Sequence, residues 1–236
     1  MAHRQERVAH RQERARRTRA ALIESAAEEF ARRGYAAASI SAILAGSKTT
    51  KGAMYFHFES KEDLARAVLD EGGASFVELS DRWLRRTDAD PFELLHGLVL
   101  DLAALFERSV IVRAEFRLMV EPEFYSDVQS LGSKHWGRAA SELAIRARVA
   151  GILVDDVDPD LFTRVLSAAL AGQRFLMDMT VGDIDLPERF VESLELVLRA
   201  SATPEWLRTH EERGWRELTS ELAPGADELF PARHSE

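Results

Sequence analysis

A run of side chains suited to DNA contact, residues 50–58, is the strongest chemical signal in the sequence. Thr50 could contact a phosphate or a thymine methyl group, and Lys51 could reach the guanine acceptors of a major groove. Gly52, at the expected start of a helix, would let the backbone approach DNA closely. Tyr55 and His57 would donate hydrogen bonds to phosphates. The run therefore predicts a recognition helix.

The same run holds residues that could instead pack in a protein core. Tyr55, Phe56 and Phe58 are aromatic, and an alternative interpretation makes all three of them core residues. One face of a short helix must pack on the domain that carries it, so we assign Phe58 and Met54 to that face. The opposite face is then left for DNA.

Other chemistries lack the residue patterns that they need. The segment 46–49 (Gly-Ser-Lys-Thr) is similar to part of a phosphate-binding loop but lacks the upstream glycine and the preceding strand. The histidines form no zinc-protease pattern, no serine-hydrolase elbow is present, and the absence of cysteine excludes disulfides and thiolate zinc sites. Asp155 and Asp156 precede an expected helix start, where carboxylates favour the helix dipole. We predict no catalytic residue, no metal, no cofactor and no enzymatic activity.

Three short helices are predicted to position the DNA-contacting run. The first begins at Thr18, carries apolar residues at helical spacing and ends at Gly34. Ser39 or Ser41 caps the second helix. A turn at residues 46–48 leads into the third helix, which extends to about Tyr55. Three short helices with brief turns are typical of a helix-turn-helix domain.

The remaining sequence also has helical periodicity. Ser60 and Asp63 resemble a capping box that opens a long helix, and the helical pattern resumes after Gly72-Gly73. Broad apolar stripes recur over residues 94–106, 162–170 and 190–198, whereas residues 118–135 are irregular and are expected to border a cavity. The predicted fold is all-α: a mobile basic arm (1–14), a three-helix DNA-binding domain (15–60), and a larger helical ligand-binding and dimerisation domain (61–236).

The charge is divided unevenly along the 236 residues. The net charge is -9, but residues 1–61 carry 12 Lys+Arg against 6 Asp+Glu (+6), and the remainder carries 19 against 34 (-15). This asymmetry favours a basic module that meets phosphates, although a solvated charged helix would give the same excess. No run of apolar residues is long enough to cross a membrane, and the N-terminus is rich in arginine, so we expect a cytoplasmic protein. The repeat at residues 2–7 and 9–14 leaves Val8 as an alternative start.

These motifs together resemble the TetR family of transcriptional repressors. The resemblance covers roughly residues 18–70 and rests on Phe30-x-x-x-Gly34-Tyr35, Ser39-Ile40-Ser41-x-Ile43 and the run from Lys51 to Leu64. The phrase KGAMYFHFESKEDLA is most similar to the gamma-butyrolactone receptors of actinomycetes. Lys48 and Thr49 depart from the family pattern, which usually has Gly and a buried Val at these positions. Either Lys48 is strained, or the turn uses Gly46 instead.

The resemblance implies a homodimer that binds a double-stranded, palindromic operator and releases it when a small-molecule inducer binds. The last two apolar helices, 160–179 and 187–200, are expected to form the dimer interface. Trp136 is expected to contact the inducer, although tryptophan in an all-α protein is more often core. The residues predicted to contact DNA are Ser39, Ser41, Thr49, Thr50, Lys51, Gly52, Ala53, Tyr55, Phe56, His57 and Lys61.

Three alternatives stay open at this point. The inducer could be an antibiotic or a biosynthetic intermediate instead of a gamma-butyrolactone. An all-α hydrolase would need a clustered acid, base or metal set. A scaffold protein would need neither Lys51-Gly52 at a helix start nor a basic N-terminal third.

Overall fold

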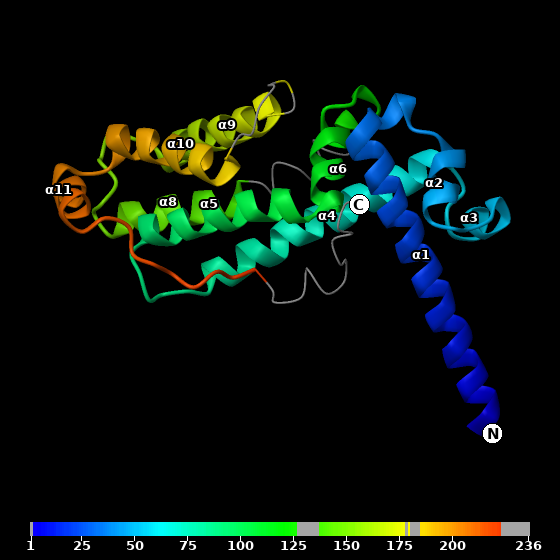
Figure 1. Cartoon of the computed structure of the whole chain (residues 1–236). Coiled ribbons are helices and arrows are strands. Elements are labelled where there is room, and N and C mark those ends of the chain that lie inside the picture. The colour runs from blue at the N-terminus through cyan, green and yellow to red at the C-terminus, as the bar shows by residue number, and fades with distance from the viewer. Residues whose placement is uncertain (1, 127–136, 178, 180–184, 223–236) are drawn as a thin grey trace. The chain divides into compact units, whose positions relative to one another are not determined.

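A computed structural model describes residues 2–126, 137–177, 179 and 185–222, and within these ranges the fold is all-α (Figure 1). Ten α-helices and one 3-10 helix are present there, and the pair Leu153 and Ala202 forms an isolated bridge. The chain divides into two compact units, Met1–Ser75 with Ser109–Ser130, and Phe76–Arg108 with Leu131–Glu236. We call them the N-terminal and C-terminal units. None of the described helices combines the length and apolar character needed to span a bilayer.

The N-terminal unit contains α1 (Ala2–Ala37), α2 (Ile40–Gly46), α3 (Lys51–His57), the first part of α4 (Lys61–Leu84), α6 (Val110–Met119) and the 3-10 helix η1 (Pro122–Phe124). Its core includes Phe30, Ile43, Met54 and Leu118, all fully buried. α6 packs along α1, and Arg117 donates a hydrogen bond of 3.1 Å to the carbonyl oxygen of Ala31. The unit therefore extends beyond the boundary expected at residue 60, because a helix from later in the sequence completes its core.

The first helix begins sixteen residues earlier than the sequence pattern predicted. α1 is helical from Ala2, so residues 2–14, which were expected to form a separate basic arm, continue into the first helix. The segment has no apolar face, but it is rich in strong helix formers, and Arg17 donates to Glu13 at 3.0 Å one turn away. Gly34 interrupts the helix with a φ of 74°, as its predicted capping role requires.

α4 runs without interruption through Gly72-Gly73, where the sequence suggested a break. A Cβ atom at position 72 would lie 2.4 Å from Cβ of Glu115 on α6, so a side chain there would collide with that helix. Gly72 is therefore explained by close helix packing and not by a turn. The predicted cap at the start of α4 is confirmed, since the backbone N–H of Asp63 donates to Ser60 Oγ at 3.0 Å.

The C-terminal unit is built around α5 (Pro91–Arg108), which packs against α8 (Arg138–Val149) and α10 (Leu186–Ser201). α9 (Pro159–Met177) packs against both α8 and α10, and α11 (Pro204–Arg213) follows (Figure 1). The two last long apolar helices thus match the predicted ranges 160–179 and 187–200. Large aromatic side chains fill the core, among them Phe76, Trp83, Phe92, Phe106 and Phe190.

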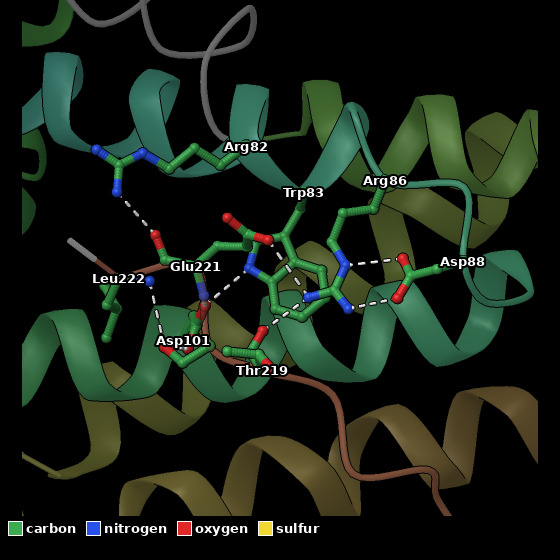
Figure 2. Close-up of polar contacts among 9 residues, drawn as sticks. Arg82, Trp83, Arg86, Asp88, Asp101, Thr219, Glu221 and Leu222 are labelled. Atoms are coloured by element: carbon green, nitrogen blue, oxygen red, sulfur yellow. Dashed lines mark hydrogen bonds and ion pairs between the residues drawn. The ribbon is translucent and has the colours of Figure 1, made fainter. Parts of the chain in front are cut away.

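Residues 214–222, which we call the C-terminal strap, are bonded to α4 and α5 around Asp101 (Figure 2). The Asp101 carboxylate is buried and accepts hydrogen bonds from Trp83 Nε1 at 2.8 Å, Ser220 Oγ at 2.6 Å and the Glu221 N–H at 2.7 Å. Arg86 donates to the carbonyl oxygen of Thr219 at 2.7 Å and also pairs with Asp88. Without the strap, the buried Asp101 carboxylate would accept a hydrogen bond only from Trp83 among these donors.

Candidate nucleic-acid interface and ligand cavity

The two short helices α2 and α3 are fixed by matching caps and by buried apolar residues. Ser39 accepts a hydrogen bond from the N–H of Ala42, and Thr50 accepts one from the N–H of Ala53, so each helix starts on a hydroxyl cap. Ile43 on α2 and Met54 on α3 are fully buried against α1. These contacts form the helix-turn-helix arrangement that the sequence predicted.

The buried Glu29 on α1 connects the first helix to the cap of the second. Its carboxylate pairs with Arg32 and Arg33 and accepts a hydrogen bond of 3.4 Å from the N–H of Ser39. The hydrogen bond from Arg32 holds the pKa of Glu29 below its ordinary value, in spite of burial. The carboxylate stays charged at neutral pH and so fixes the start of α2.

The turn between α2 and α3 resolves the alternative that the sequence left open. Lys48 has a φ of 51°, in the left-handed region, while Gly46 is the last residue of α2. A Cβ atom at position 46 would lie 2.3 Å from Ser25 Oγ, so Gly46 is needed for close packing on α1. Lys48 therefore carries the backbone strain where the resembling family usually has glycine.

Lys48→Gly is expected to raise the free energy of unfolding by about 1 kcal/mol, because glycine occupies the left-handed region without a Cβ penalty. Chemical denaturation followed by circular dichroism measures the change. Lys48→Ala is the matched control: it removes the same charge but keeps the Cβ atom, and should bring no gain. Equal stabilisation by both variants would show that charge, and not backbone strain, is responsible.

The face of α3 opposite the core is exposed. Tyr55 is 45% exposed and Phe56 is 74% exposed, whereas Met54 and Phe58 are buried. The assignment of Met54 and Phe58 to the core is confirmed, and the interpretation of all the aromatics as core residues is wrong. Thr50, Lys51 and Gly52 are exposed at the start of the helix, and Ala53 is half-buried. A large exposed aromatic surface beside a lysine is typical of an interface.

Several side chains on α3 also contact one another. The Lys51 ammonium lies 5.8 Å from the centre of the Tyr55 ring, and the half-buried His57 meets Phe56 edge to face with ring centres 5.0 Å apart. Ser41 is exposed, and its Oγ lies 2.9 Å from Ser39 Oγ. These residues, with those at the start of α3, stay predicted DNA contacts.

Two further predicted contact residues have internal partners that the sequence did not reveal. Thr49 Oγ1 lies 2.8 Å from Ser47 Oγ within the turn. The Lys61 ammonium donates to the carbonyl oxygens of Tyr35 at 2.8 Å and Ala38 at 3.1 Å, and lies 4.4 Å above the Tyr35 ring. Lys61 therefore joins the start of α4 to the end of α1. A contact of either residue with DNA remains a prediction.

The C-terminal unit encloses a small apolar cavity with a volume of about 40 Å³. Its walls include Phe76, Leu98, Phe106 and Phe190, and two hydroxyl groups, those of Ser80 and Ser167, line it among the described residues. Most of the apolar lining residues belong to the stripes that the sequence predicts as core. Ser167, a hydroxyl within one of those stripes, is the signal that could have indicated a cavity, whereas Ser80 lies outside them. Trp136, the predicted inducer contact, lies outside the described residues.

No group of three metal-ligating side chains suited to an ion is found in the residues that the structure describes. The described residues that line the cavity are apolar apart from two serines, and no acid or base is among them.

Comparison with known proteins agrees with this arrangement. Residues 22–68 match the family model described as bacterial regulatory proteins, tetR family. The A-factor receptor protein of Streptomyces griseus is 29% identical over 194 residues, which cover 82% of this chain and 67% of that protein. The structure of full-length TylP, a TetR regulator from Streptomyces fradiae, is 31% identical with a TM-score of 0.66, covering 83% of this chain and 92% of that one.

A solved structure described as a gamma-butyrolactone receptor (ArpA-like protein) has a TM-score of 0.66 and is 28% identical, covering 81% of this chain and 92% of that one. The match to TylP is above 30% identity and extends over nearly the whole of that protein. These relatives and this fold are those of DNA-binding regulators and not of enzymes. The chain belongs to the TetR family of bacterial transcriptional regulators, and within that family it resembles the gamma-butyrolactone receptors.

Proposed function

We propose that this chain is a dimeric repressor that binds a near-palindromic operator through α3 and releases it when a gamma-butyrolactone-like signal binds the C-terminal unit. The family assignment makes it a ligand-responsive DNA-binding repressor. The observation that supports the operator-binding face is the exposed side of α3, on which Lys51, Tyr55 and Phe56 lie opposite the buried Met54.

Gly52 adds support for close approach of DNA to α3. A Cβ atom at this position would meet nothing within 4 Å, so the fold itself does not require glycine there. Glycine is a common choice where the backbone must approach a ligand closely. We infer that the phosphate backbone of the operator is this partner.

Lys51→Ala is expected to weaken binding to an operator duplex by about 1–3 kcal/mol and binding to random duplex by less, because Lys51 is proposed to reach base edges. The duplex is selected from a random pool with the purified chain, and affinities are measured by fluorescence anisotropy at several salt concentrations. Equal losses of affinity for both duplexes would show that Lys51 contacts phosphate and not base edges. Failure of the parent chain to select any palindromic sequence would overturn the proposed operator.

An exposed apolar stripe on α9 supports the proposed dimer. Leu161 and Phe175 are 44% and 49% exposed. They belong to a series in steps of four and three residues, which we call the α9 stripe: Leu161, Val165, Ala168, Gly172 and Phe175. Such a series places all its members on one helix face, and the small residues at its centre allow two helices to approach closely.

Two-fold pairing would set the spacing of the two recognition helices. Successive major grooves on one side of the duplex are about 34 Å apart, so a two-fold dimer reads a near-palindromic site. An inducer that binds better to a dimer with another spacing would release the operator through its differential affinity for the two states.

The apolar cavity is the proposed inducer site. Binding sites for small ligands usually have volumes of about 300–1,000 Å³, so the cavity of about 40 Å³ must enlarge to accept a lactone with an alkyl chain. A ligand that fits only an enlarged cavity would release the operator if the enlarged state is the one that binds DNA less well. The hydroxyl groups of Ser80 and Ser167 are the candidate hydrogen-bond donors to a lactone carbonyl.

Ser80→Leu is expected to abolish release by a synthetic gamma-butyrolactone and to leave operator affinity unchanged, because the larger side chain fills the cavity. Leu170→Ala, which enlarges the same cavity, is the control and should keep the response. Both are measured by adding ligand to the preformed DNA complex. If an antibiotic releases the parent chain from DNA and no butyrolactone does so, the inducer is not the proposed gamma-butyrolactone-like signal.

A further inference from the structure

A second and larger cavity lies in the C-terminal unit, between the start of α5, the turn after α8, and α11 with the residues that follow it. Its volume is about 570 Å³, within the range of small-molecule sites. It shares no lining residue with the apolar cavity assigned to the inducer. A ligand here would therefore occupy a site separate from that of the proposed inducer.

A buried carboxylate with one unsatisfied oxygen lies in the wall of this cavity. Glu93 is 8% exposed, and its Oε2 is buried and has no hydrogen-bond partner. The nearest cation, Nε of Arg216, is 3.9 Å from Oε2, while Nη1 of Arg216 donates to the carbonyl oxygen of Asp88 at 2.9 Å. Burial, and then the neighbouring Asp90, raises the pKa of Glu93. A donor supplied by a ligand would satisfy this oxygen.

Two indole rings in the same wall are held by bonds at their N–H groups. Trp206 Nε1 donates to Asp90 Oδ2 at 3.3 Å, and Trp215 Nε1 donates to Glu195 Oε1 at 3.1 Å. The His210 ring stacks on Trp206 with ring centres 4.9 Å apart, and its centre is 4.1 Å from that of Trp215. Both indole positions are therefore set before any ligand arrives, which limits the entropy cost of binding.

Two imidazoles pack beside these rings, and burial keeps that of His96 uncharged at neutral pH. His210 Nδ1 is buried without a hydrogen-bond partner and belongs to a ring that lines the cavity. His96 stacks on Trp215 with ring centres 4.1 Å apart, and burial lowers the pKa of His96 to about 4. A neutral His96 does not repel a cation bound near Trp215.

We infer that this cavity binds a small amine that carries a flat apolar body. Its protonated amino group would donate to Glu93 Oε2, and its apolar body would lie against Trp206 and Trp215. An ammonium group supplies three donors and a positive charge, which suits an unsatisfied carboxylate oxygen beside aromatic rings. Arg213 and Arg216 also line the cavity, and both are exposed. For the Arg216 guanidinium to move away from a bound ammonium group, its hydrogen bond to the carbonyl oxygen of Asp88 must break.

Phenethylamine is the probe, and its binding to the full chain is measured by isothermal titration calorimetry. We expect saturable binding that is about tenfold tighter than that of 2-phenylethanol or phenylacetate, which have the same ring but no ammonium group. Glu93→Gln should weaken phenethylamine binding about tenfold or more, because it removes the charge but keeps the shape. Glu192→Gln, on the exposed side of α10, is the matched control and should leave binding unchanged.

Thr209→Trp gives an independent test, because it fills the cavity from α11 while Glu93 stays in place. This variant should lose phenethylamine binding and keep operator binding, which shows that it is folded. No saturable binding to the parent chain at millimolar concentrations would overturn the inference. Equal affinity for phenylacetate, or unchanged affinity in Glu93→Gln, would overturn it as well.

Discussion

Replacing Phe175 by glutamate on the exposed side of α9 is expected to give a folded monomer that binds operator duplex about 100-fold more weakly than the parent chain. Phe175 is 49% exposed within one chain, so the substitution costs the isolated unit little. In a dimer paired through the α9 stripe, the same position would bury two unpaired carboxylates related by the two-fold axis. That burial costs several kcal/mol and opposes association.

Analytical ultracentrifugation measures the mass of the Phe175→Glu variant, and fluorescence anisotropy measures its affinity for the selected duplex. Val149→Glu is the matched control, since Val149 is an apolar residue at the end of α8 and is 83% exposed. It lies outside α9 and α10 and should remain a dimer with full affinity. If Phe175→Glu also remains a dimer, the interface lies elsewhere, and the α9 stripe has another partner.

Gly97→Ala is expected to destabilise the C-terminal unit by about 3 kcal/mol or more, because a methyl group has no space there. A Cβ atom at position 97 would lie 2.0 Å from Cη2 of Trp83. The indole cannot move away easily, because it is fully buried and its Nε1 is bonded to Asp101, while the guanidinium of Arg86 lies 4.7 Å above its ring. Relief of the collision would break one of these contacts.

Urea denaturation followed by tryptophan fluorescence measures the loss. Gly52→Ala is the comparison, because a Cβ atom at position 52 meets nothing within 4 Å. It should leave the free energy of unfolding unchanged or slightly higher, as alanine favours the helix, and should weaken operator binding. A similar loss of stability in both variants would show that helix position, and not the collision with Trp83, decides the result.

Local signals in the sequence predicted the local structure well. The caps at Ser39 and Ser60, the helix break at Gly34 and the burial of Met54 and Phe58 each depend on a few neighbouring residues. The departure at Lys48 was also visible, because a missing glycine in a tight turn leaves a Cβ atom in the left-handed region.

The missed features depend on partners far away in the sequence. Gly72 suggested a helix break. The glycine is explained instead by the close approach of Glu115 on α6. That contact is not visible in the residues that surround Gly72 in the sequence. The internal partners of Lys61 were not foreseen, because folding alone brings the carbonyl oxygens of Tyr35 and Ala38 close to it. The helical start of α1 was missed for another reason: it has no apolar face, and periodicity detects only amphipathic helices.

The C-terminal strap also sets an order of events during synthesis. Ser220 is 119 residues later in the chain than its partner Asp101. Ribosomes add about 5–20 residues per second, so roughly 6 to 24 s pass between the synthesis of Asp101 and the synthesis of the strap residues that donate to it. All described residues of the N-terminal unit precede residue 127, so that unit can finish folding on the ribosome first. A nascent chain would therefore carry a folded DNA-binding unit while its second unit is still open to chaperones and proteases.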